Sequence, residues 1–438
     1  MQNVDPYLII MAASVIIIFS FFFGEVSKRT NVPSVLMLIV LGIVIKFGLD
    51  AVGLGQLDFF PVLQILGIIG LIMIVLEAAL ELKLDSDKLI SIGKALLVAA
   101  LGLIASTWVA ALILHEFIDG MTTEVAWLYA TPLSILSSAI IIPSVAGLKA
   151  SKREFHIYES TFSDILGIML FYFVVSQIPM PVAEDSLDVV EHHASGLAYL
   201  GNILLTIAAS VVASYAIVLI FQNIKSHVKL FLLIAVLLLL YALGKTIHLS
   251  SLIIILTFGL IIANMRLFFR GPLKNWLNYK KALHIYEGLH VVTVETAFVV
   301  RTFFFVIFGI TISLATLFSV DVAIVSLLII LSIYVIRFVL LRVFIGPDIF
   351  PQLFVAPRGL ITILLFYAIP TELTVEGFEP GVLLFIIIGT SLIMTFSMVV
   401  DKKRTSAAIR KVSEAPVGYE RWKAPTLADV APEPDPNH

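Results

Sequence analysis

The sequence has no cysteine and few charged residues. Because none of the 438 residues is a cysteine, disulfides and thiolate metal sites are excluded. Only 13% of the residues are charged and 60% are hydrophobic, a balance that excludes a soluble fold. The net charge of -3 indicates little about partners, and we expect no nucleic acid and no cofactor among them. An intramembrane enzyme is the least favoured class, since the apolar segments lack an HExxH pair.

Long apolar runs occupy most of the chain. A helix needs about 20 apolar residues to cross the hydrocarbon core of a bilayer. Thirteen segments meet this requirement, namely 7–24, 33–49, 59–82, 94–114, 125–148, 157–178, 196–221, 228–244, 249–265, 291–315, 320–345, 354–370 and 380–400. The sequence therefore predicts an all-α polytopic membrane protein with about 13 transmembrane helices over residues 1–400. The remainder, 401–438, is expected to be a partly disordered cytoplasmic tail because its end is rich in proline and acidic residues.

The basic residues indicate how the chain is oriented. Lysine and arginine concentrate on the cytoplasmic side of membrane proteins. With the N-terminus outside, most of the 28 lysines and arginines fall in inner segments, and the outer loops 183–193 and 371–380 are acidic. We therefore expect a multi-pass protein of the cell (inner) membrane, embedded in the lipid bilayer, with its C-terminus in the cytoplasm.

The segment 158–173 carries two carboxylates within an apolar run. A bare Asp at the bilayer centre costs roughly 2.5 to 3.5 kcal/mol even by low estimates, so Glu159 and Asp164 are either neutralised or used. Ser160 lies four residues before Asp164 and shares its helical face, and Ser163 is adjacent. Their oxygens are hard ligands that suit a cation such as Na+. Asp164, Ser160 and Ser163 are the candidate ion ligands, with Asp164 and Ser160 as the central pair of a metal-ion site.

Two of the expected helices are interrupted. Prolines break the segment 130–150, and a Pro-Arg-Gly run breaks the segment 355–365. The two segments are the fifth and twelfth helices, as two inverted six-helix repeats (helices 1 to 6 and 8 to 13) would place them. Matching interrupted segments in two halves point to the midplane site of a transporter, although both could be ordinary proline kinks. The residues expected near the site are Ser137, Ser138, Pro143 and Arg358.

Buried charges elsewhere need partners. Arg337 is the lone charge of the apolar run 329–341, and a buried guanidinium needs a carboxylate, so we predict a structural ion pair between Glu159 and Arg337. Glu295 and Arg301 are six residues apart, too far for a good pair along one helix. Each is expected to face another helix or the cavity near the site, and the sequence assigns neither a partner.

A third-helix carboxylate, Glu77, has two possible roles. It lies about one turn inside the predicted membrane segment. It could line a cytoplasmic funnel, or it could pair with a charge on another helix that the sequence does not identify. The two interpretations stay open.

The polar residues form a pattern across the chain. It consists of Glu159 with Ser160, Ser163 with Asp164, the isolated Arg337, the run Pro357, Arg358 and Gly359, and LEAALEL at 76–82. The pattern resembles the sodium/proton antiporters of the cation:proton antiporter superfamily, in particular the NhaP-like exchangers, over nearly all of residues 1–400. The resemblance implies that Asp164 binds the ion, that Glu159 pairs with Arg337, and that the protein is a homodimer.

The chain departs from the family pattern at two places. The family usually has Thr-Asp before the proline of the interrupted fifth helix, where this chain has Ile141 and Ile142. The family's Asn-Asp or Asp-Asp pair is Ser163 and Asp164 here. A site with one carboxylate where many relatives have two suggests electroneutral exchange, since one carboxylate holds one cation or one proton.

These features together predict a secondary antiporter that exchanges Na+ or Li+, with K+ as a further candidate, for H+. Its core helices would be about 94–178 and 320–400, and its dimer or scaffold helices about 7–82 and 196–315. Two alternatives stay open: a proton-coupled transporter of another solute on the same fold, and a transport-inactive membrane sensor or channel subunit.

Overall fold

The computed structural model describes most of the chain. The described residues are 6–30, 32–51, 60–84, 88–178, 196–224, 229–246, 251–268, 279–311 and 319–414. Within these ranges the secondary structure is helical, with no strand. The helices are α1 (Pro6–Thr30), α2 (Ser34–Ala51), α3 (Phe60–Glu81), α4 (Leu89–Phe117), α5 (Thr123–Ser134), α6 (Ser138–Ser144), α7 (Ala150–Gln177), α8 (Gly196–Phe221), α9 (Lys229–Thr246), α10 (Ser251–Ala263), α11 (Met265–Phe268), α12 (Tyr279–Thr311), α13 (Val320–Phe344), α14 (Leu360–Tyr367) and α15 (Gly381–Glu414).

The expected all-α membrane fold is confirmed. In the described part of the chain, ten helical spans are long and apolar enough to cross a membrane, and two shorter apolar helices, 230–244 and 252–263, accompany them. Each of the thirteen expected segments contains helix, but the segment 354–370 contains only a 3-10 turn and the short α14. The count of thirteen crossings and the inverted repeats therefore stay predictions.

The outer surface of the helix bundle is apolar. Large hydrophobic side chains are exposed along the outer helices, for example Phe21 on α1, Ile104 on α4, Val335 on α13 and Phe396 on α15. Soluble proteins do not expose apolar surface on this scale, whereas a bilayer solvates it. An apolar outer surface of this extent is typical of a helix bundle in a bilayer.

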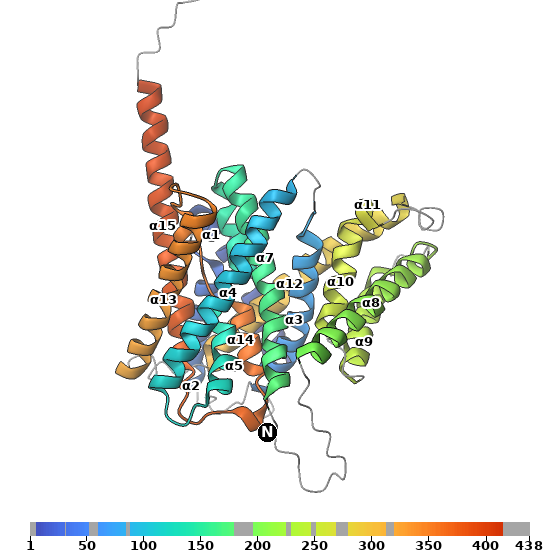
Figure 1. The fold of residues 1–438 in the computed structure, drawn as a ribbon, viewed down its shortest axis with the longest axis horizontal. Coiled ribbons are helices and arrows are strands. Elements are labelled where there is room, and N and C mark those ends of the chain that lie inside the picture. Colours follow the sequence, from blue (N-terminus) through green and yellow to red (C-terminus); the bar gives the residue numbers. More distant parts are fainter. Residues whose placement is uncertain are drawn as a thin grey trace, which may run out of the picture.

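The helices pack as two groups. Helices α4 to α7 pack with α13 to α15, helices α1 to α3 pack mainly with α10 and α12, and α8 and α9 pack against α10. In Figure 1, α13 and α15 lie at one side of the bundle, α8 to α10 at the other, and α3, α7 and α12 between them. Helix α3 contacts both α7 and α14, so the boundary between the two groups runs past α7.

Local sequence determines where the interrupted helices begin and end. The Thr122 side chain caps α5 by accepting a hydrogen bond from the Val125 amide, and α5 ends at Ser134, close after Pro132. The backbone is extended at Ile135 and Ser137 before α6 begins. The observed interruption at 135–137 lies between Pro132, which is inside α5, and Pro143, which is inside α6.

Candidate functional site

The two interrupted segments meet in space. The Ser137 amide donates a hydrogen bond of 3.0 Å to the carbonyl oxygen of Pro357, which joins the break between α5 and α6 to the break before α14. A side chain at Gly359 would collide with Ser137 and Ile140, so the contact requires a residue without a Cβ atom. Non-helical backbone at membrane depth is tolerated only where it is buried in protein or lines a cavity, and here each break provides a partner for the other.

We predict that Gly359→Ala disrupts this contact between the two interrupted segments. The added methyl would lie 2.9 Å from both Ser137 Cβ and Ile140 Cδ1, well inside van der Waals contact. Overpacking of this kind costs about 1 to 3 kcal/mol, so we expect lower thermal stability and slower transport. The matched control is Gly147→Ala, since a Cβ atom there meets nothing within 4 Å. Equal stability of the two variants would contradict the assigned contact.

Arg358 donates hydrogen bonds to the backbone where the two interrupted segments meet. Its side chain is buried, its Nε donates 2.8 Å to the carbonyl oxygen of Leu133, and its Nη1 donates 3.0 Å to that of Ala356. Its own amide donates to Thr390 Oγ1 on α15. A cation at the C-terminal end of α5 also complements the helix dipole. Arg358 therefore satisfies carbonyl groups that the interruptions leave without helical partners.

Asp164 lies on α7 beside the start of α6. Its side chain is 2% exposed, and its Oδ2 accepts a hydrogen bond of 3.3 Å from the Ser138 amide. Its Oδ1 is buried and has no hydrogen-bond partner among the described residues. A buried carboxylate oxygen without a partner is costly unless a proton or a cation occupies it. Asp164 is thus equipped to bind either one.

The two serines of the predicted ligand set are already engaged. Ser160 Oγ donates 2.7 Å to the carbonyl oxygen of His156 within α7. Ser163 Oγ accepts a hydrogen bond of 3.0 Å from the Leu136 amide in the break after α5. Ser163 therefore helps to hold the interrupted segment against α7. To ligate an ion, each hydroxyl oxygen would have to bind the ion in addition to its present hydrogen bond.

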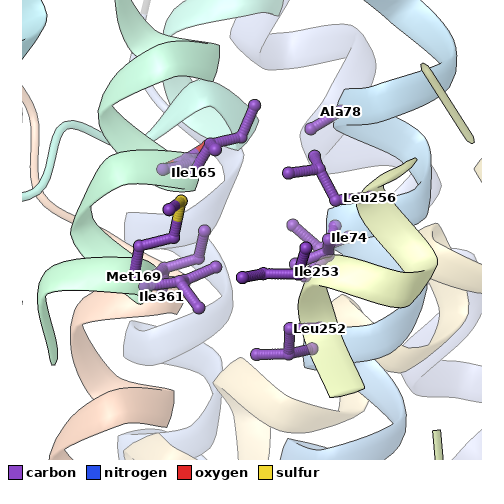
Figure 2. A pocket seen from close by; sticks show the side chains of 11 residues that line it. Ile74, Ala78, Ile165, Met169, Leu252, Ile253, Leu256 and Ile361 are labelled. Carbon is purple, nitrogen blue, oxygen red and sulfur yellow. The ribbon is translucent and has the colours of Figure 1, made fainter. Parts of the chain in front are cut away.

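An apolar cavity lies on one side of Asp164. Besides Asp164, its lining consists of apolar residues of α3, α7, α10 and α14, including Ile74, Ile165, Leu256 and Ile361. Figure 2 shows the side chains of α7 and α14 facing those of α3 and α10 across this space. Because the two faces belong to the two helix groups, the cavity marks their boundary beside the carboxylate.

A second cavity near the site is lined by charged residues. Glu77 and Glu81 of α3, Arg301 of α12, and Ser138 and Pro143 of the interrupted segment line it. Arg301 Nη2 lies 3.0 Å from Glu77 Oε2 and 3.2 Å from Glu77 Oε1. Glu77 therefore pairs with a charge on another helix and lines a cavity, and its role in a cytoplasmic funnel stays a prediction.

Glu295 lies apart from the other site candidates. It is exposed on the surface of α12, and the lining residues of the two cavities near Asp164 do not include it. Its position differs from the one expected near the site because the helix turns its side chain outward. Arg301, six residues later, points to the other side of the same helix and reaches α3.

Glu159 and Arg337 are in direct contact. Arg337 Nη1 lies 2.6 Å from Glu159 Oε1, and Nη2 lies 2.9 Å from Oε2, a bidentate arrangement. Arg337 Nε also donates 3.2 Å to the carbonyl oxygen of Gln352. The pair joins α7 to α13, and Glu159 is 1% exposed. His156, one residue before the predicted membrane segment 157–178, is fully buried beside this pair.

Interrupted helices that cross beside a buried carboxylate define a class of protein, the ion-coupled secondary transporters of helical membrane fold. Within that class, the chain belongs to the sodium/hydrogen exchanger transmembrane family, which matches residues 14–401. It is therefore a multi-pass cation:proton antiporter and not an enzyme.

The fold is similar to that of a solved antiporter. The structure of the sodium proton antiporter MjNhaP1 from Methanocaldococcus jannaschii at pH 8 has a TM-score of 0.65 and 17% sequence identity, covering 90% of this chain and 96% of that chain. An electron-microscopy structure of the same antiporter has a TM-score of 0.60 at 17% identity, covering 94% of this chain and 99% of that one. No curated protein matches the sequence.

Proposed function

We propose that this antiporter exchanges Na+ or Li+ for H+ one for one, with K+ as a weaker candidate, and that Asp164 binds the cation and the proton in turn. The observation that carries the proposal is the buried Oδ1 of Asp164, which lacks a hydrogen-bond partner among the described residues. An ionised Asp164 would take the cation, and protonation would release it. Among the residues that line the apolar cavity, Asp164 is the only carboxylate, which supports an exchange of one charge for one charge.

Ligation of the cation would draw on oxygens close to Asp164. Ser160 and Ser163 lie on the same helix, and both hydroxyl oxygens keep a lone pair beyond their present hydrogen bonds. The interrupted segment 135–137 adds carbonyl groups outside regular helix. Ile141 and Ile142 provide no side-chain ligand, so the cation depends on Asp164 for its only full negative charge.

Alternating access would come from movement of the core, α4 to α7 with α13 to α15, against the scaffold formed by the other helices. The way these helices pack supports this division, because the apolar cavity beside Asp164 lies between the two groups. Glu77 and Glu81 line the other cavity, which we place on the cytoplasmic side from the distribution of basic residues, and their charge would attract cations. A homodimer through scaffold helices, in the cell membrane with the N-terminus outside, completes the proposal.

Proteoliposomes test the proposed exchange. With a pre-formed pH gradient, added Na+ or Li+ is expected to dissipate the gradient saturably, K+ to do so less effectively, and choline not to do so. Clamping the membrane potential should leave the rate unchanged, since one-for-one exchange moves no net charge. A protein that ignores all three alkali cations would contradict the cation assignment, and a rate that follows the potential would contradict electroneutrality.

A further inference from the structure

A buried histidine lies beside the ion pair that joins α7 to α13. His156 is in the second turn of α7 and is 0% exposed. Its Nδ1 lies 3.0 Å from Glu159 Oε2, the oxygen that also accepts from Arg337 Nη2 at 2.9 Å. The carboxylate of Glu159 thus meets three nitrogen atoms, two of Arg337 and one of His156.

The charge of this cluster determines which group donates. Arg337 is always protonated, and its guanidinium contacts both oxygens of Glu159, so the carboxylate is ionised. An ionised carboxylate has no proton to donate and can only accept hydrogen bonds. His156 Nδ1 must therefore carry a proton and donate it to Glu159 Oε2.

The other ring nitrogen indicates that the imidazole is neutral. His156 Nε2 is buried and has no hydrogen-bond partner among the described residues. A protonated Nε2 would be a buried cationic donor without an acceptor, which is costlier than a bare lone pair. The neighbouring charges point the same way: Arg337 already balances Glu159, and Lys152, one turn earlier, pairs with Asp348 and donates to the carbonyl oxygen of Phe350.

We propose that His156, as the neutral imidazole protonated at Nδ1, is a positioning residue that holds Glu159 on Arg337 and keeps that carboxylate fully occupied, so that Asp164 alone binds the exchanged cation. The inference rests on the proposed function of Asp164. Glu159 lies five residues before Asp164 on α7 and lines the same polar cavity as Ser163. Without the His156 donor, one lone pair of Glu159 is released beside Ser163, and the carboxylate can turn from Arg337.

Three substitutions of His156 separate hydrogen bonding from packing. Asn places an N–H group near the position of Nδ1, Gln places one near the position of Nε2, and Leu has neither. We expect His156→Asn to keep at least about half of the wild-type transport rate per folded protein, and His156→Gln and His156→Leu to lose about fivefold or more, because each lacks the charge-assisted hydrogen bond. If His156 only fills space, Leu performs as well as Asn, and that result overturns the proposal. Should the Leu variant fail to fold, the Asn and Gln variants decide the question.

The tautomer of His156 is measurable without transport. Nitrogen NMR of the full protein in lipid nanodiscs, with 15N-labelled histidine, distinguishes a protonated from a bare ring nitrogen, and the signal missing in His156→Asn gives the assignment. We expect a protonated Nδ1 and a bare Nε2. An imidazolium, or a proton on Nε2, overturns the proposal. Because this measurement does not depend on ion exchange, it still decides the role of His156 if wild-type protein fails to transport, a result that would count only against the proposed function.

Discussion

Replacing Asp164 by Asn is expected to reduce cation-driven dissipation of a pH gradient to the level of empty liposomes. The amide has nearly the same volume as the carboxylate and can still accept from the Ser138 amide, so the fold should survive. It cannot take up a proton or neutralise a cation in a site buried to 2% exposure. Transport by the purified variant, reconstituted beside wild type at equal protein, provides the measurement.

The matched control for this experiment is another Asp on a membrane helix. Asp321 is exposed in the first turn of α13, away from the crossing. Asp321→Asn removes the same charge and should transport at about the wild-type rate. Loss of transport in the control as well, or activity of Asp164→Asn that matches wild type, would contradict the assigned role of Asp164.

Replacing Arg337 by Met should have the largest effect on stability. The carboxylate of Glu159, whose side chain is 1% exposed, would stay negatively charged, and His156 would be its only remaining hydrogen-bond donor among the described residues. Removing one partner of a buried ion pair costs about 3 to 5 kcal/mol, because the remaining charge is uncompensated. Thermal unfolding followed by size-exclusion chromatography in detergent measures the loss, and the yield of folded protein should fall with it.

Two further variants show whether the effect of Arg337→Met comes from the unpaired charge. Combining it with Glu159→Gln removes both charges and leaves a carbonyl that can accept from His156, so we expect most of the lost stability to return. The control is Glu154→Gln, which breaks the ion pair between Glu154 on α7 and Lys88. Because the two side chains are 38% and 40% exposed, this variant should change stability by no more than about 1 kcal/mol. If the double variant is no more stable than Arg337→Met alone, the ion pair does not account for the loss.

The apolar runs were sufficient to predict most of the fold. Length and hydropathy alone located segments that all contain helix, and the prolines indicated an interruption in the segment that divides into α5 and α6. The number of crossings could not be predicted with the same certainty, because α14 is only eight residues long and the segment before it is irregular. A hydropathy window averages over such a break.

The candidate site was predicted in part. The sequence paired Glu159 with Arg337 because a buried guanidinium needs a carboxylate, and the two side chains are in contact in the structure. The same reasoning could have joined Glu77 to Arg301, the remaining opposite charges at membrane depth. Spacing alone does not show that Glu295 faces outward, so it does not distinguish Glu295 from Glu77 as a buried charge.

His156 and Arg358 show what sequence patterns do not contain. Arg358 was expected near the site, but its bonds to the carbonyl oxygens of Leu133 and Ala356 depend on how the two breaks cross. His156 follows the basic run at the start of α7 and lies one residue before the predicted membrane segment 157–178. In the structure it contacts Glu159, which contacts Arg337 of α13, and a contact to a helix so distant in sequence is not visible in the local pattern.

Competition between cation and proton at Asp164 is most directly measured as proton release. Purified wild-type protein in weakly buffered detergent solution, titrated with Na+ or Li+, is expected to release a proton for each cation that it binds, with saturation, whereas Asp164→Asn should release none. Choline chloride at equal ionic strength is the blank. Equal proton release from both proteins, or cation-driven transport by wild type without any proton release on binding, would contradict the role of Asp164 as the shared site.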